Sequence, residues 1–162
     1  MNYYELFDLE VKPVVDKSNL ANKYFELQRQ FHPDFHNEQN AEEQEKMVEK
    51  SALINKAFNT FKDTQLTLEY FLKLSGMIQE EEKYPLPNDF LMEMMEFNEE
   101  VGEIEPSEAR QKVKQMEDEL YLSIQQFLGH NKADFFEEEL KELRVYYFKK
   151  KYLQRILDRL AV

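Results

Sequence analysis

The sequence predicts an all-α protein made of two helical domains. Only 3 glycines and 5 prolines interrupt 162 residues, which leaves few turns and favours a few long helices. Apolar residues recur at helical spacing, whereas the alternation that is typical of strands is absent over any useful length. The 13 phenylalanines and 9 tyrosines supply bulky side chains for a modest core in each domain.

Residues 1–76 are predicted to form a helical hairpin between short flanking helices. A brief helix over Tyr3–Leu9 comes first, and Asp16 or Ser18 can cap the next helix. That helix has an apolar stripe at positions i, i+4, i+7 and i+11, which are Leu20, Tyr24, Leu27 and Phe31. A helix near Glu42–Phe61 is expected to pack against it in antiparallel fashion. A last short helix begins at Asp63 or Thr64 and stops at Gly76.

Residues 77–88 are predicted to be a linker, because they combine a charged run, Glu80-Glu81-Glu82-Lys83, with Pro85 and Pro87. Residues 89–162 are then expected to form a three-helix bundle. Its helices run over Phe90–Glu105, from Ser107 to the turn at Gly129, and from Asp134 onward. Asn88 or Asp89 can cap the first of these helices.

Charge and composition narrow the possible functions. The formal net charge of −12 argues against a nucleic-acid partner and against an anionic membrane surface, because both rely on basic residues. We therefore interpret Lys149-Lys150-Lys151 as a solvated helix face or a partner for nearby carboxylates. No run approaches the roughly 20 apolar residues of a membrane span, and the first residues lack the pattern of a signal peptide. These observations predict a cytoplasmic protein.

His32-Pro33-Asp34 is the most informative motif. It closes one helical pattern and opens a polar stretch, so Pro33 is expected to hold His32 and Asp34 on a solvent-facing loop. One alternative is a metal site formed by His32, Asp34 and His36, since this spacing can supply ligands. Besides these two histidines there is only His130, and no partners that would orient the imidazoles are evident, so we expect neither a metal nor another cofactor.

Signals for catalysis are also missing from the sequence. There is no cysteine, no G-x-S-x-G motif and no glycine-rich phosphate loop. Paired carboxylates occur throughout so acidic a chain and are uninformative. The sequence therefore predicts a protein that acts by binding rather than an enzyme. A His/Asp metalloenzyme and a purely structural helical protein are the competing interpretations.

The first predicted helix of the second domain has two apolar faces. At 100° per residue, one side carries the core stripe Phe90, Met94, Phe97, Val101 and Ile104. The opposite side carries Leu91, Met92 and Met95 beside Glu96, Glu99 and Glu103. A three-helix bundle does not require this second apolar face, and methionines pack adaptably against partners. The alternative is that Leu91 and Met92 pack against the N-terminal domain.

The N-terminal half resembles a J-domain. The resemblance rests on Tyr3-Tyr4-Glu5-Leu6-Phe7, the helix Leu20–Phe31, the His32-Pro33-Asp34 loop and Ile54-Asn55-Lys56-Ala57-Phe58. It implies a J-domain over residues 1–76 that contacts a heat-shock-seventy-class chaperone and stimulates its ATP hydrolysis. The positions that match the family's contact residues are His32, Pro33 and Asp34, with Lys23 and Arg29 as basic companions.

The C-terminal half is similar to that of the HscB family, the J-domain co-chaperones of iron–sulfur cluster assembly. Asp89-Phe90-Leu91-Met92-Glu93 and Glu99-Glu100-Val101-Gly102-Glu103-Ile104-Glu105 carry this resemblance. It implies binding of an iron–sulfur scaffold protein (IscU type) and its delivery to a specialised chaperone (HscA or DnaK type). The matching positions are Leu91, Met92, Met95, Glu96, Glu99, Glu103 and an aromatic residue of the last helix, for which we favour Tyr147 over the registers that select Val145 or Phe148. A general J-domain co-chaperone with a different client is the alternative.

Overall fold

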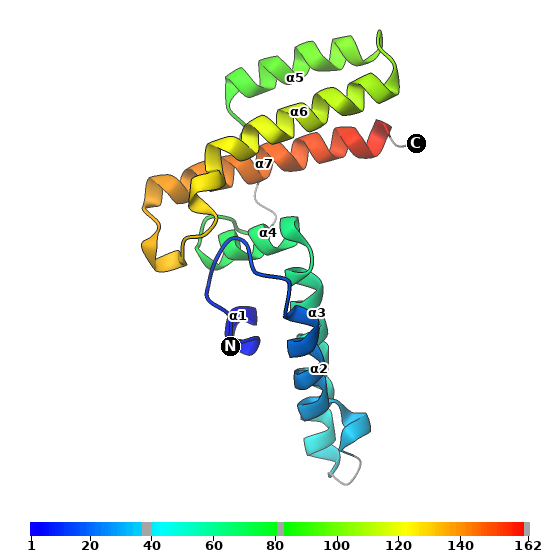
Figure 1. Ribbon diagram of the computed structural model, residues 1–162, viewed down its shortest axis with the longest axis vertical. Coiled ribbons are helices and arrows are strands. Elements are labelled where there is room, and N and C mark those ends of the chain that lie inside the picture. The colour runs from blue at the N-terminus through cyan, green and yellow to red at the C-terminus, as the bar shows by residue number, and fades with distance from the viewer. Residues whose placement is uncertain (37–39, 81–82, 161–162) are drawn as a thin grey trace. The chain divides into compact units, whose positions relative to one another are not determined.

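The computed structural model describes residues 1–36, 40–80 and 83–160. Over these residues the chain forms α-helices and short 3-10 helices without any strand, which confirms the all-α prediction (Figure 1). The α-helices are α1 (Tyr3–Leu6), α2 (Leu20–Phe31), α3 (Ala41–Phe61), α4 (Thr64–Leu74), α5 (Asn88–Val101), α6 (Pro106–Ile124) and α7 (Glu137–Leu160). The 3-10 helices are η1 (Pro33–Phe35), η2 (Gln125–Phe127) and η3 (Lys132–Asp134).

The chain divides into two compact units. The first unit comprises Met1–Phe71 with His130–Ala133, and the second comprises Leu72–Gly129 with Asp134–Val162. The boundary between the two units therefore falls inside α4, between Phe71 and Leu72. The domain bounds that we expect from the sequence, 1–76, 77–88 and 89–162, stay a prediction about which parts act independently.

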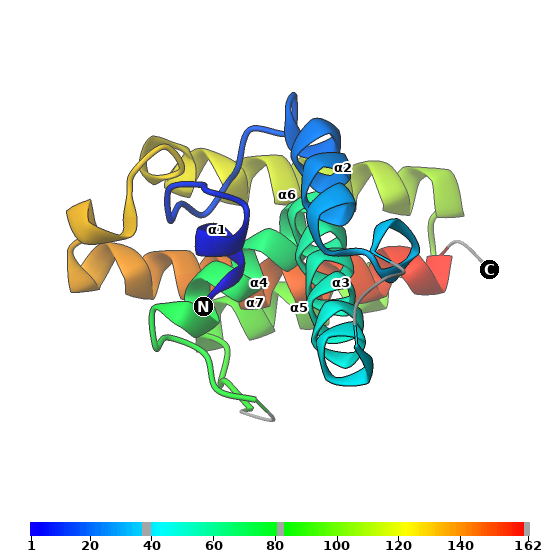
Figure 2. The ribbon, with the colours of Figure 1, turned by 90° about the horizontal axis from the view of Figure 1, so that it is seen from below.

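The first unit is built on the antiparallel pair α2 and α3, which lie side by side in both views (Figures 1 and 2). Its core is aromatic. The ring of Phe61, which is fully buried near the end of α3, lies 6.4 Å from Tyr3, 5.0 Å from Tyr4 and 5.7 Å from Phe7, measured between ring centroids. Because aromatic pairs at such distances favour tilted and edge-to-face geometry, they hold the short helix α1 against α3.

A buried polar network joins α2 to α3. Gln28 is only 7% exposed, and its amide nitrogen donates to the Ser51 carbonyl at 3.3 Å and to Asn55 Oδ1 at 3.0 Å. Its amide oxygen accepts from the Ser51 hydroxyl at 2.8 Å. The Tyr24 hydroxyl donates to the same Asn55 oxygen at 2.7 Å. Of the predicted stripe on α2, Leu20 is buried but Tyr24, Leu27 and Phe31 are only half-buried. The other buried residue of this helix is the polar Gln28, which apolar periodicity does not indicate.

The helix ends agree with the sequence in some places and differ in others. Asp63 Oδ1 accepts from the Leu66 amide and so caps α4, and Gly76 ends that helix with φ at +75°. The Met77 amide donates to the Leu72 carbonyl at 2.9 Å, which completes a Schellman motif. The α2 cap differs from our expectation: Asn19 is the N-cap residue and makes no side-chain cap bond. Asp16 instead accepts from the Ser18 amide within the preceding turn.

The second unit places α5, α6 and α7 side by side, as predicted (Figure 1). The expected core residues of α5 are confirmed: Phe90, Met94 and Phe97 are buried together with residues of the other two helices, which are Ala109, Val113, Leu153 and Ile156. The bounds of all three helices differ from the sequence prediction, and α6 ends at Ile124 instead of at the Gly129 turn. α5 ends at Val101, so Ile104 packs from the turn that follows, and α7 begins at Glu137 after a separate 3-10 turn.

Asn88 and Asp89, which we expected as caps of α5, lie inside its first turn, and Pro87 is the N-cap residue. The fixed φ of a proline suits the entry to a helix, although it offers no side-chain acceptor. In the part of the chain that the structure describes, no helix combines the length and apolar character needed to cross a bilayer.

The network around Gln28 makes a testable prediction about stability. Gln28→Ala should lower the free energy of unfolding by about 1–3 kcal/mol, because it leaves the buried Ser51 and Asn55 groups without their partner. The measurement is urea denaturation followed by circular dichroism. Gln30→Ala, on an exposed site of the same helix, is the matched control and should change the stability by less than about 0.5 kcal/mol. Equal effects of the two substitutions would contradict a stabilising role for the network.

Candidate functional site

The HPD loop, His32–Asp34, begins where α2 stops. His32 has the extended backbone geometry, with φ −74° and ψ 131°, that a residue before proline prefers. Pro33 then opens η1, and the Phe35 amide donates to the His32 carbonyl at 3.0 Å. The Asp34 amide donates to His32 Nδ1 at 3.1 Å, which fixes the imidazole against the turn. Asp34 is exposed and His32 is partly exposed, so the loop presents both side chains outward as predicted from the sequence.

His36 ties this loop to both helices of the hairpin. Its Nε2 lies 3.2 Å from the Arg29 carbonyl, so this nitrogen donates to the last turn of α2. The side-chain amide of Gln44 on α3 donates to the His36 carbonyl. The His36 amide donates to the Pro33 carbonyl at 3.0 Å. We did not predict this anchoring role, and the only sequence signal was a histidine close to the end of a helix.

The metal alternative can be compared with the same geometry. His32 Nδ1 and His36 Nε2 each bond to the backbone of the loop or of α2. Among the residues that the structure describes, no three histidine, aspartate or glutamate side chains are grouped so that they could hold a metal ion. The described part of the loop therefore offers no set of ligands that converge on one point.

The two basic companions differ in their surroundings. Arg29 is exposed in the last turn of α2, close to the loop. Lys23 is half-buried, and its Nζ donates to the Phe7 carbonyl at 2.9 Å and to the Asp8 carbonyl at 3.1 Å. Lys23 therefore holds the end of α1 against α2, whereas Arg29 is available on the surface near the loop.

Two exposed aromatic side chains, one on α2 and one directly after the loop, were not among the predicted site residues. Phe25 on α2 is 61% exposed and Phe35 directly after the loop is 63% exposed. The Phe35 ring meets the His32 imidazole edge-on, with 6.2 Å between centroids. Exposed phenylalanines are costly to hydrate and are enriched in binding surfaces, so both are candidates for partner contact.

The second group of predicted residues lies on the side of α5 that faces away from the core. We call Leu91, Met92, Met95, Glu96, Glu99 and Glu103 the outer face. Leu91 is 38% exposed, Met92 is 64% exposed and Met95 is 66% exposed. The three glutamates are exposed as well. Glu103 lies in the turn just after α5, where its amide donates to the Glu100 carbonyl. Five of the six residues thus lie on α5, and Glu103 follows in the turn after it.

The outer face is strongly acidic. Residues 89–105 hold seven carboxylates and no lysine or arginine. Glu100 forms an ion pair with Lys112 on α6, and this hydrogen bond raises the pKa of Lys112. Glu96, Glu99 and Glu103 make no such pair within the described residues. An apolar centre with an acidic rim suits a partner that is apolar and basic.

The last helix places its candidate residues differently from our expectation. Tyr147, which we favoured as a scaffold contact, is only 2% exposed. It shares a buried stripe of α7 with Leu143, Tyr146 and Leu153, so the structure does not offer it to a partner. The run Val145-Tyr146-Tyr147-Phe148 is apolar on every side, and for that reason the sequence could not identify which residue faces the core.

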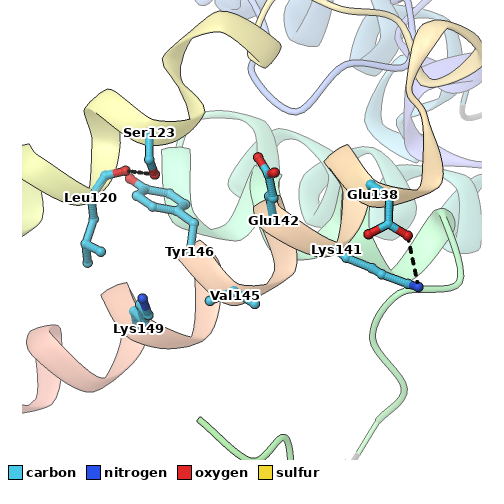
Figure 3. A pocket seen from close by; sticks show the side chains of 8 residues that line it. All are labelled: Leu120, Ser123, Glu138, Lys141, Glu142, Val145, Tyr146 and Lys149. Atoms are coloured by element: carbon cyan, nitrogen blue, oxygen red, sulfur yellow. Dashed lines mark hydrogen bonds and ion pairs between the residues drawn. The ribbon is translucent and has the colours of Figure 1, made fainter. Parts of the chain in front are cut away.

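Val145 and Phe148 are half-buried and border two separate cavities. Val145 lines a cavity of about 450 Å³ between α6 and α7, together with Leu120, Tyr146 and Lys149 (Figure 3). Burial raises the pKa of Tyr146 to about 12, so its hydroxyl keeps its proton at neutral pH. Phe148 stacks on Tyr84, with 4.8 Å between ring centroids, and lines the second cavity.

A helical hairpin with His-Pro-Asp at its tip makes the first unit similar to a J-domain. A J-domain joined to a helical bundle defines a class of J-domain co-chaperones. Residues 86–161 match the family model described as the HSCB C-terminal oligomerisation domain. The chain is 39% identical to a co-chaperone protein HscB homolog of Shewanella pealeana over 137 residues, which are 83% of this chain and 76% of the relative. The chain belongs to the HscB family.

Other relatives and solved structures agree with this assignment. An HscB homolog of Shewanella amazonensis is 44% identical to this chain over 107 residues. The match covers 64% of this chain and spans about 60% of the length of that relative. The crystal structure of the human co-chaperone protein HscB superposes with a TM-score of 0.79 at 28% identity, covering 99% of this chain and 81% of the human one. The structure of the chaperone HscB from Vibrio cholerae superposes with a TM-score of 0.64 at 28% identity, and the match covers 99% of both chains.

The anchoring by His36 makes a prediction about the loop. His36→Ala should speed amide hydrogen exchange at Phe35 and His36, because the loop loses its side-chain bond to the Arg29 carbonyl. His36→Gln keeps an N–H donor at this site and should retain most of the protection. The measurement is hydrogen exchange followed by NMR at neutral pH. Unchanged exchange in the alanine variant would contradict the anchoring role.

Proposed function

We propose that this chain is a co-chaperone that binds an iron–sulfur scaffold protein of the IscU type and delivers it to a heat-shock-seventy-class chaperone of the HscA or DnaK type, whose ATPase it stimulates. The single observation that carries the proposal is the presence of two separate exposed sites, the HPD loop and the outer face, on a chain of the HscB family. The chain itself acts without catalysis or a cofactor, in the cytoplasm, and aids the maturation of iron–sulfur proteins.

The HPD loop supports the chaperone-binding part of the proposal through its preorganisation. Backbone bonds within η1 and the anchors on α2 and α3 hold the loop in one conformation before any partner arrives. A loop that is already ordered loses little conformational entropy on binding. Asp34 in η1 and Arg29 in the last turn of α2 are both exposed and carry opposite charges, which suits a partner surface that carries both signs.

The outer face supports the scaffold-binding part. Leu91, Met92 and Met95 are exposed although three other apolar residues of the same helix fill the core, so folding alone does not require them. Burial of a Leu or Met side chain in an interface contributes roughly 1.5–3 kcal/mol. The flexible methionine side chains can adapt to the shape of a partner, and the acidic rim steers a basic one.

Coupling follows from having both sites on one chain. A scaffold held on the outer face is kept near the chaperone that the HPD loop contacts, which raises its local concentration there. A general J-domain co-chaperone with a different client is the second candidate function, because the HPD loop would serve it equally well. The two candidates differ only in what binds the outer face.

The chaperone-binding hypothesis predicts the effect of Asp34→Asn. This variant should lose most of the stimulation of the partner's ATPase, because it removes an exposed charge from the loop but keeps its size. Steady-state ATP hydrolysis by the chaperone measures the effect. Asp118→Asn, which makes the same change at an exposed site of α6, is the control and should stimulate like the unmodified chain. Full stimulation by Asp34→Asn would exclude the hypothesis.

The scaffold-binding hypothesis predicts the effect of replacing Leu91, Met92 and Met95 together by alanine. Scaffold affinity should fall at least about tenfold, since losing even one buried contact costs on the order of 1–3 kcal/mol. Calorimetric titration measures the affinity, and circular dichroism checks the fold. A control that replaces three exposed apolar residues elsewhere, Val48, Leu66 and Leu122, should bind the scaffold as before.

Two outcomes would count against this hypothesis. Undiminished scaffold binding by the folded triple variant would exclude the outer face as the contact. A large loss of stability in the triple variant would instead indicate that Leu91 and Met92 pack within the protein. Salt gives an independent check, because affinity should fall as ions shorten the Debye length below its physiological value of about 8 Å.

A further inference from the structure

A second cavity of the second unit shares no residue with the outer face and has a different chemical character. It encloses about 350 Å³ between residues 83–86 and α7. Its walls carry three cationic side chains, Lys83, Lys151 and Arg155, and an apolar side formed by Tyr84, Phe148 and Tyr152 with Leu86. Among the residues that the structure describes, no carboxylate lines it, although acidic residues outnumber basic ones by 33 to 21 in the whole chain.

The three cations of this cavity have no carboxylate partner within the described residues. None of the ion pairs found there involves Lys83, Lys151 or Arg155. Lys151 lies 5.8 Å from the centroid of Tyr147, a weak interaction that leaves its charge uncompensated. Residues 143–157 contain five basic side chains and no acidic one. The cavity is therefore a local positive site on a strongly negative chain.

The aromatic side of the cavity is held in place without a ligand. Tyr84 stacks on Phe148 with 17° between the ring planes, and the guanidinium carbon of Arg144 lies 4.8 Å from the centroid of Tyr84. Arg144 is itself fixed by a hydrogen bond to the Met77 carbonyl at 3.3 Å. The Tyr152 ring meets Phe90 edge-on at 5.9 Å, and its hydroxyl accepts from the Asn98 side chain at 3.4 Å. The rings thus form a rigid apolar wall.

We propose that this cavity binds a small organic phosphate of the size of a nucleoside monophosphate. The cations come from two different segments and line the same cavity, so they can contact several oxygens of one phosphate group. The rigid aromatic wall supplies apolar contact for the organic part. The volume is near the lower end of small-molecule sites, which are about 300–1,000 Å³, and an extended peptide would need a longer groove.

The proposal goes beyond co-chaperone function and does not depend on it. Its test is calorimetric titration of the full chain with adenosine monophosphate, inorganic phosphate and adenosine. We expect adenosine monophosphate to bind at least about tenfold more tightly than either part alone, because the ligand needs both the cations and the apolar wall. Phe148→Leu, which removes the ring but keeps an apolar side chain, should reduce this preference over inorganic phosphate.

Matched variants locate the binding. Lys151→Gln with Arg155→Gln should weaken binding of adenosine monophosphate by about tenfold or more, because two of the three positive charges that line the cavity are lost. Lys114→Gln with Lys150→Gln makes the same change in net charge outside this cavity and should leave the affinity within about twofold.

Four results would overturn the proposal. The first three are the absence of binding at millimolar ligand, equal affinity for adenosine monophosphate and inorganic phosphate, and equal losses in the two double variants. Binding of an acidic peptide at this cavity without any binding of adenosine monophosphate would also overturn it, and would identify a protein-docking site instead.

Discussion

The break that Pro33 imposes between α2 and α3 is the constraint on which the geometry of the HPD loop depends. Proline forces extended geometry on His32 and removes a helical donor, so α2 must end at Phe31. The chain then turns through η1, and His36 closes the turn by donating to the last turn of α2. The network around Gln28 joins α2 to α3, and the rings around Phe61 hold α1 against α3. A motif of three residues is thus displayed by contacts spread over the whole first unit.

In the second unit, α5 has two faces of different character. Phe90, Met94 and Phe97 pack against α6 and α7 in the core. The outer face takes no part in this core. Charge is divided as well: residues 89–105 carry seven carboxylates and no basic residue, whereas residues 143–157 carry five basic residues and no acidic one. The bundle therefore carries an acidic segment and a basic segment.

Much of the fold could be predicted from the sequence because it follows from local rules. Helical periodicity identified α2, α3, α5, α6 and α7, and Pro33 and Gly76 identified where α2 and α4 end. Gln28 escaped prediction because its burial depends on partners on another helix, Ser51 and Asn55. Tyr147 was assigned to a surface because a run of four apolar residues gives no register, and only packing decides that it is buried.

The candidate sites also divide into those that a sequence pattern indicates and those that only the folded structure reveals. The residues of the HPD loop and the outer face are contiguous or follow helical spacing, so the sequence could indicate them. The cavity lined by Lys83 and Arg155 could not be found in this way, because its two segments meet only after the unit folds. The role of His36 likewise depends on a bond to a backbone carbonyl, which no pattern of side chains reveals.

The central claim is that one chain must carry both sites in order to couple the scaffold to the chaperone. The most direct measurement is ATP hydrolysis by the chaperone in the presence of the scaffold protein and an equimolar mixture of two variants, one altered at Asp34 and the other at Leu91, Met92 and Met95. Each variant keeps one site intact, but neither can hold the scaffold and contact the chaperone together. The account predicts that the mixture fails to restore the stimulation given by the unmodified chain. Full stimulation by the mixture would contradict it.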